Sequence, residues 1–208
     1  MGQLQKRSIG DSVNIFYLDE CPRTSAMLHC DKHVVKMIVE YAQLLSTAHR
    51  VLDGELYIDD SSGRKIKRWR HPDVSFENNL YKASFVNHPS AVWVRESAWN
   101  YHWLEHLWHH LCSEYNHRYN KDHATYIKLA KYLQVIPQKL PLNIDKTEVP
   151  QCMPDDVKGK DPVAAYRDYY RKYKKGFAKW TNRQVPSFME KTIISKTPIT
   201  ELNEFFTL

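Results

Sequence analysis

The longest regular pattern of apolar residues begins at Ser25 and ends near Leu52. Its apolar positions recur three and four residues apart, at Met27, Cys30, Val34, Met37, Ile38, Tyr41, Leu44, Leu45, Ala48, Val51 and Leu52. This spacing predicts one long helix that buries a single face. Asp53 and Gly54 follow, and glycine suits the left-handed position that ends many helices. Before the helix, the apolar run "VNIFYL", 13–18, predicts a buried strand or extended segment.

A second helical pattern extends over 88–119. Its predicted buried positions are Trp99, Trp103, Leu104, Leu107, Trp108, Leu111 and Tyr115. A shorter helix is predicted over 124–134. Asp161 and Pro162 have the residue types that favour a helix start, so they predict another helix in "DPVAAYRDYYRKYKK". The fold class expected is mainly α, as a single compact helical domain over 13–188.

The remaining segments predict one small β element and several irregular stretches. Residues 55–69, "ELYIDDSSGRKIKRW", read as a β-hairpin inserted in the helical domain, with its turn near Gly63. The stretch 137–162 holds five prolines and predicts a long surface loop. Residues 1–12 are expected to form a flexible leader, and 189–208 a C-terminal tail.

The first long helix carries a narrow stripe of polar residues. At 100° per residue, this stripe contains His29, His33, Lys36, Glu40, Gln43 and Thr47. Large apolar residues flank it on one side, and Val35, Val39, Ala42 and Ser46 flank it on the other, so we expect its groups to be partly desolvated. Burial would raise the pKa of Glu40 and nearby Lys36 would lower it, which is how acid–base groups are tuned. The alternative is a structural ion pair on a half-buried helix.

Other kinds of chemistry find less support in the residues. His29 and His33 are spaced to share a metal, as are His102, His106 and His110, but no third ligand has a fixed spacing. A metal at His29 and His33 is therefore the weaker alternative, and no cofactor is predicted. The sequence contains neither a G-x-S-x-G nucleophile motif nor a glycine-rich phosphate loop.

Composition indicates a class of partner through charge. The 208-residue chain has a net charge of +6, which favours an anionic partner, and nucleic acid is the commonest one. No apolar run is long enough to span a bilayer, and there is no secretory segment. We therefore expect a cytoplasmic protein, in the host cytoplasm if a phage encodes it, with its four cysteines as free thiols.

Two basic segments interleave cations with aromatic residues, "RKIKRWRH" and "RKYKKGFAKWTNR". Cations neutralise phosphates and aromatic rings can stack on bases, so DNA is the expected partner. The predicted DNA-binding residues are Arg64, Lys65, Lys67, Arg68, Arg70, Arg95, Lys174, Lys175, Lys179 and Arg183. The alternative for the aromatic residues Trp69, Trp180, Tyr169, Tyr170 and Tyr173 is that they pack in the core.

Two resemblances to known families bear on function. The blocks "HCDKHVVKMIVEYAQLLSTAHR", "NHPSAVWVRESAWNYHWL", "DPVAAYRDYY" and "FAKWTNRQVPSF" resemble a family of small proteins found largely in tailed phages. That resemblance implies a phage or phage-like origin and brings no activity. Over 13–119, the order of motifs resembles the pyrimidine-dimer DNA glycosylases, all-helical phage repair enzymes with linked abasic-site lyase activity. Asp31 and His33 match their Asp-x-His, Glu40 their catalytic Glu seven residues later, and Asn87-His88 their Gly-His.

This second resemblance implies a DNA glycosylase with Glu40 as general acid/base, and His33 and His88 positioning substrate or protons. The family's nucleophile is an N-terminal α-amine, but here a dozen residues precede the "NIF" run. The family's arginines beside the Glu are replaced by Val39 and Gln43. Lys36 could supply a substitute amine, or Glu40 could activate water.

Two other functions remain open at the level of the sequence. One is a metal-dependent nucleotide- or base-modifying enzyme that uses His29 and His33. The other is a non-enzymatic protein that binds nucleic acid or a host factor.

Overall fold

The computed structural model describes residues 13–190, so the predicted leader and most of the predicted tail lie outside it. The described chain is mainly helical with one two-stranded hairpin, which confirms the predicted fold class. The helices are α1 (Pro22–Leu28), α2 (Asp31–Asp53), α3 (Val74–Asn79), α4 (Pro89–Glu96), α5 (Ala98–Tyr119), α6 (Ala124–Leu133) and α7 (Pro162–Tyr169). The strands are β1 (Glu55–Asp59) and β2 (Ile66–Arg70). Short turns of other helix types lie at Asp155–Val157, Tyr170–Lys174 and Ser187–Met189.

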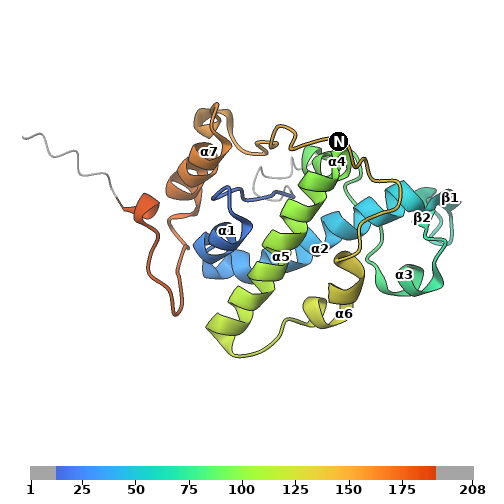
Figure 1. Ribbon diagram of the computed structural model, residues 1–208, viewed down its shortest axis with the longest axis horizontal. Coiled ribbons are helices and arrows are strands. Elements are labelled where there is room, and N and C mark those ends of the chain that lie inside the picture. Colours follow the sequence, from blue (N-terminus) through green and yellow to red (C-terminus); the bar gives the residue numbers. More distant parts are fainter. Residues whose placement is uncertain (1–12, 191–208) are drawn as a thin grey trace, which may run out of the picture.

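The two longest helices, α2 and α5, form the centre of the fold (Figure 1). They pack against each other, with α1 along α5 and with α4 and α6 also against α2. The Trp108 indole donates a hydrogen bond of 2.9 Å to the Ile38 carbonyl between α5 and α2. Trp93 and Trp108 are almost fully buried, and a large side chain removed from water contributes roughly 1.5–3 kcal/mol. None of the described helices is long and apolar enough to cross a membrane.

Both long helices predicted from the apolar pattern are interrupted. His29 and Cys30 have extended backbone, which divides the expected helix 25–52 into α1 and α2. Ser97, with φ −154° and ψ 157°, divides the expected helix 88–119 into α4 and α5. Contacts from distant segments hold the breaks, since the Asp31 N–H donates to Lys179 and the Ala98 N–H to Pro141, each over 2.8 Å.

Gly54 ends α2 in a different way from the one predicted. Its backbone is extended, with φ −85° and ψ 162°, so no left-handed conformation is involved. A Cβ at this position would lie 2.4 Å from the Arg50 carbonyl oxygen and 3.0 Å from that of Arg70. Glycine is therefore needed because the chain leaves α2 close to the backbone of β2.

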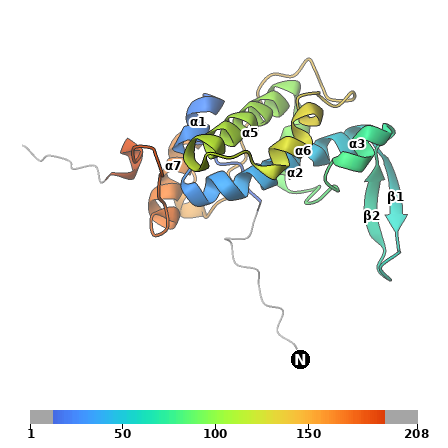
Figure 2. The same cartoon turned by 90° about the horizontal axis from the view of Figure 1, so that it is seen from below.

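The hairpin projects from the end of α2, away from the helical body (Figure 2). Its antiparallel register pairs Glu55 with Arg70 and Asp59 with Ile66. Arg50, 4% exposed, anchors its base. The guanidinium donates to the carbonyls of Tyr81, Trp69, Glu77 and Leu80 and to the Glu77 carboxylate.

The predicted extended segment and proline-rich loop are both bound to other parts of the fold. Residues 13–18 form no strand and are buried in extended form, with the Phe16 N–H donating to the Tyr41 hydroxyl over 3.0 Å. From 137 to 161 the only regular structure is the turn Asp155–Val157. Asn14 donates to the Cys152 carbonyl over 2.8 Å, so this loop is bound to the start of the described chain.

Candidate functional site

Glu40 is held at the edge of the core by α2. Its side chain is 18% exposed, and Oε1 lies 3.0 Å from Nζ of Lys36, one turn earlier. Oε2 is buried, and the described residues offer it no hydrogen-bond partner. Burial raises the pKa of Glu40, and the contact with Lys36 only partly opposes that rise. The carboxyl group therefore has one oxygen paired with Lys36 and one buried oxygen without a partner among the described residues.

The surroundings of Glu40 differ from the expected pair of apolar walls. Met37 and Tyr41 are buried on one side, but Val35 and Val39 are 44% and 40% exposed on the other. The helical wheel shows which residues share a face, whereas only packing decides whether a neighbour covers that face. Glu40 thus lies between the core and an open face of α2.

His33 is buried beside this face and carries no positive charge near neutral pH. The Tyr170 hydroxyl lies 2.5 Å from its Nδ1, and its ring stacks on Phe16 at 4.2 Å between centroids. Burial, with help from His29 and Lys174, lowers the pKa of His33 to about 2. Burial also holds the pKa of Tyr170 well above its usual value, so the phenol donates and the imidazole accepts. The predicted part of His33 in positioning protons stays a prediction.

His29 has no free nitrogen for a metal shared with His33. Its Nδ1 lies 2.7 Å from the Ser25 carbonyl oxygen, and its Nε2 lies 2.9 Å from the Tyr41 hydroxyl. The two imidazole centroids are 6.5 Å apart. The break between α1 and α2 also removes His29 from the helical stripe. This arrangement does not fit the weaker alternative of a metal at His29 and His33.

His88 lies at the start of α4, where its Nδ1 accepts a hydrogen bond from the Ser90 N–H over 3.2 Å. Burial lowers the pKa of its ring. It lines a shallow hollow together with Pro89, Pro150, Gln151, Cys152, Met153 and Lys158. His33, Lys36 and Glu40 are not among the residues that line this hollow, and the predicted part of His88 in positioning substrate or protons stays a prediction.

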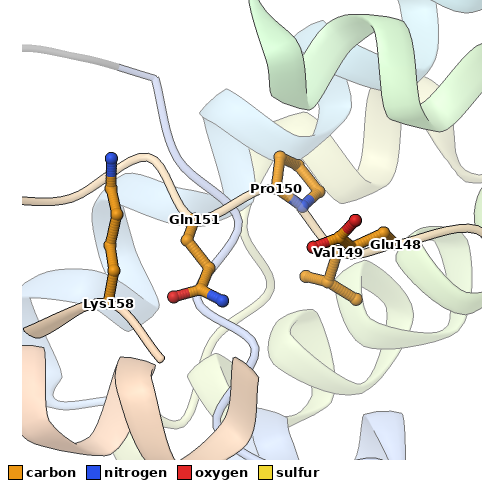
Figure 3. Close-up of a pocket in the computed structure, with 5 residues that line it drawn as sticks. All are labelled: Glu148, Val149, Pro150, Gln151 and Lys158. Carbon is orange, nitrogen blue, oxygen red and sulfur yellow. The ribbon is translucent and has the colours of Figure 1, made fainter. Parts of the chain in front are cut away.

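An adjoining hollow is formed by the loop before α7, and Lys158 and Glu148 stand at its two sides (Figure 3). Gln151 is fixed there by two hydrogen bonds with the Gly159 backbone, at 2.6 and 3.0 Å. Lys158 also pairs with exposed Asp155 at 2.7 Å. Gln151 and Lys158, two of the polar residues of this hollow, thus bind to the loop that forms it.

The open face of α2 continues onto the segment after α7. Nζ of Lys174 lies 4.4 Å from the centre of the Tyr169 ring and 6.0 Å from that of Phe16, which stacks on His33. Nζ of Lys32 lies 4.9 Å from the centre of the Phe177 ring. Sequence reasoning missed Lys32, although its position one turn before Lys36 indicated the same side of the helix. We call Lys32, Lys36 and Lys174 the lysine face.

Apart from half-buried Lys174, which belongs to the lysine face, the predicted DNA-binding cations divide into two groups. Those with exposed side chains are Arg64, Lys65, Lys67, Arg70, Lys175 and Lys179. Arg183 instead forms a two-point ion pair with buried Glu114, at 2.8 and 2.9 Å. Arg95 donates to the Ala91 and Val86 carbonyls, and half-buried Arg68 lies 3.7 Å from Asp59. These three guanidinium groups stabilise the fold, so we leave them out of the surface proposed below.

The aromatic residues of the basic segments mostly pack in the core. Tyr169 and Tyr170 are buried, and buried Trp180 donates to the Leu28 carbonyl over 3.0 Å. Trp69 is half-buried, and Tyr173 is 43% exposed. For the first three residues the core interpretation is correct, and only Tyr173 presents a largely open ring.

Comparison with known proteins adds one finding. Residues 13–127 match the family model described as pyrimidine dimer DNA glycosylase. The matched stretch includes α2 with Glu40, the hairpin, α4 and α5. No curated protein and no solved structure matches the chain.

Proposed function

Because the chain belongs to the pyrimidine dimer DNA glycosylase family, we propose that it cleaves the N-glycosidic bond of a damaged or modified base in DNA. The family supports DNA as substrate and base removal as the type of reaction. The raised pKa of Glu40 and the positive charge of the lysine face support the assignment of the site to the open face of α2.

The observation that carries the proposal is the state of Glu40. A general acid/base works best when its pKa lies near the working pH, and burial moves the pKa of Glu40 upward in that direction. Its Oε2 has no hydrogen-bond partner among the described residues. A carboxyl oxygen in this state can give a proton to the departing base or accept one from the attacking nucleophile.

Lys36 is the proposed nucleophile of a linked lyase step. Its Nζ lies 3.0 Å from Glu40, so the carboxylate can accept the proton that the ammonium must lose before it attacks. The neutral amine then forms a bond to C1′ of the sugar as the bond between C1′ and the base breaks. The proton held by Glu40 passes to the departing group, and the sugar remains attached to Lys36 as an imine after its ring opens.

The proposed DNA surface joins the lysine face to the hairpin. Glu40 and Asp53 are about 20 Å apart along α2, because a helix rises about 1.5 Å per residue. That length corresponds to about six base pairs of duplex DNA. The hairpin cations Arg64, Lys65 and Lys67 lie beyond Asp53, so we expect them to contact phosphates about six base pairs or more from the reacting sugar.

The direct test uses a duplex oligonucleotide with a single pyrimidine dimer and measures release of the glycosidic bond. Glu40→Gln should lower the rate by at least about 100-fold while DNA affinity is retained. Glu105→Gln is the matched control, because Glu105 is a buried carboxyl group whose pKa is also raised by burial, but it lies on α5. Equal rates for the Glu40→Gln variant and the unmodified protein would show that Glu40 is not the acid/base.

Borohydride reduction tests the lyase step separately. An oligonucleotide with an abasic site should be trapped covalently on the unmodified protein and on Lys32→Ala, but not on Lys36→Ala. Adducts that persist in Lys36→Ala would assign the amine elsewhere. If glycosidic cleavage occurs without any adduct, Glu40 activates water and the lyase step is wrong. Salt-sensitive DNA binding without any product would instead favour a non-enzymatic protein.

A further inference from the structure

A second cluster of reactive side chains lies at the other end of α2. His49 and Asp53 are one turn apart on this helix, and His71 directly follows β2. All three side chains are buried, and one ligand atom from each lies within 4.8 Å of the other two. The residues come from segments that meet only through the fold, where the hairpin joins the helical body.

Two of these side chains are already oriented as metal ligands usually are. Nε2 of His49 lies 2.9 Å from the Tyr101 hydroxyl, which in turn donates to the Leu133 carbonyl over 2.9 Å. The Tyr101 proton is thus used, so Nε2 of His49 must donate and its Nδ1 keeps a lone pair. Asp53 accepts the backbone N–H groups of Gln138 and Lys139, at 2.9 and 3.0 Å. Such outer hydrogen bonds typically orient the ligands of bound metals.

The third side chain supplies independent evidence for a ligand. His71 is 8% exposed, and its Nε2 has no hydrogen-bond partner among the described residues. This nitrogen faces Asp53, at 4.0 Å from Oδ2, which is too far for a hydrogen bond. Buried polar atoms are normally satisfied, so an unpartnered nitrogen directed at a carboxylate indicates a ligand that both of them bind.

We propose that His49, Asp53 and His71 bind a divalent transition-metal ion of the zinc class. Two imidazole nitrogens and one carboxylate oxygen are a donor set that suits zinc and neighbouring metals. Ligands of one tetrahedral zinc lie about 3.4 Å apart, so the side chains must move inward slightly. The Asp73 N–H now donates to Nδ1 of His71 over 3.1 Å. When the metal takes Nε2, the ring proton moves to Nδ1 and that bond opens.

The position of the proposed metal site indicates a structural role. Its ligands on α2, His49 and Asp53, lie about 14 and 20 Å along the helix from Glu40, so the metal would take no part in the chemistry proposed there. It would connect α2, the exit of β2 and the loop at Gln138, and would thus hold the hairpin in a fixed direction. The inference does not depend on glycosylase activity, and binding of the metal can be measured without it.

The test begins with the full chain, freed of metal by a chelator and titrated with cobalt(II) and zinc(II). We expect one ion per chain and a visible cobalt spectrum that zinc removes. His71→Gln and Asp53→Asn should each weaken binding by at least about 100-fold. The matched control is His102→Gln with His106→Gln, an exposed histidine pair with the same i,i+4 spacing, which should bind as the unmodified protein does.

X-ray absorption of the zinc-loaded, unmodified chain supplies a measurement that needs no variant. Nitrogen and oxygen neighbours at about 2.0–2.1 Å support the site, whereas sulfur at about 2.3 Å would assign the metal to a cysteine. Failure to bind one ion per chain would overturn the proposal. So would binding that is lost in the His102/His106 variant and retained in His71→Gln.

Discussion

Glu40 illustrates how a single side chain can be costly to bury and useful for that reason. Its raised pKa means that the fold favours the protonated carboxyl group over the carboxylate. The stability that protonation contributes is complete below the pKa of the unfolded chain and is lost as pH rises through the higher folded value. The carboxylate present at neutral pH therefore weakens the fold, a cost that a site serving only stability would not retain.

The first prediction follows from the upward shift in the pKa of Glu40. Glutamine mimics the neutral acid, so Glu40→Gln should gain stability relative to the unmodified protein as pH rises from about 4 to 7. The measurement is urea unfolding at several pH values. Glu20→Gln should show the opposite trend, because hydrogen bonds from Lys146 and Tyr17 outweigh burial and lower the pKa of Glu20. Parallel trends for the two variants would contradict the argument.

Gly54 gives a second prediction for a single residue. Gly54→Ala should reduce the free energy of unfolding by about 1–3 kcal/mol, because the new methyl group meets the backbone of Arg50 and Arg70. Gly176→Ala is the control, since a Cβ there has no neighbour within 4 Å, and its effect should stay within about 0.5 kcal/mol. Similar losses in the two variants would mean that close packing is not the cause at Gly54.

Among the elements, the hairpin depends most on a contact outside itself. A two-stranded hairpin is only marginally stable alone, and the strands bury little of their own surface. Arg50 offsets this by binding the end of β2 at Trp69 and the chain that follows it at Glu77 and Leu80. A residue on α2 thus fixes the chain where it leaves the hairpin.

The prediction at this scale concerns that arginine. Arg50→Met keeps much of the side-chain volume but leaves Glu77 and several carbonyls unpaired, so it should cost about 3–5 kcal/mol of stability. Thermal unfolding measures the loss, and hydrogen exchange should show it first at the hairpin base. Arg64→Met, in the exposed hairpin turn, should change stability by less than about 0.5 kcal/mol. A small effect of Arg50→Met would show that the hairpin is held by other contacts.

For the whole molecule, charge is distributed over two regions joined by α2. The lysine face lies at the start of the helix, and the hairpin cations lie beyond its end. If one DNA duplex contacts both regions, its affinity must depend steeply on salt, because each neutralised phosphate releases counterions. If only one region contacts DNA, the affinity would depend less steeply on salt.

The final prediction measures this dependence. Replacing Arg64, Lys65 and Lys67 with glutamine should weaken DNA binding and reduce the slope of log affinity against log salt. The reduction should reach up to about 0.9 for each phosphate that is no longer neutralised. Lys128→Gln on α6, outside the proposed surface, should leave the slope unchanged. An unchanged slope in the triple variant would remove the hairpin from the DNA surface.

The sequence by itself determined the helical class, the hairpin and the residues of the polar stripe from His33 onward. These follow from local rules, since periodicity and turn residues act over a few positions of the chain. The same rules identified Glu40 and Lys36 as neighbours, because an i,i+4 pair on a helix needs no tertiary contact to meet. The same rules could not predict that His29 lies outside the stripe. The helix breaks before α2, and a contact with distant Lys179 helps to hold that break.

Only the tertiary structure decided which polar groups are free and which are engaged. The sequence predicts Arg183 as a DNA contact, but its guanidinium is paired with Glu114. It predicts His33 as a group that handles protons, but Tyr170 and Phe16 cover the imidazole. His71 lies beside Asp53 only because the chain returns to the end of α2 as it leaves β2. Burial and pairing depend on segments far apart in sequence, and local periodicity carries no information about them.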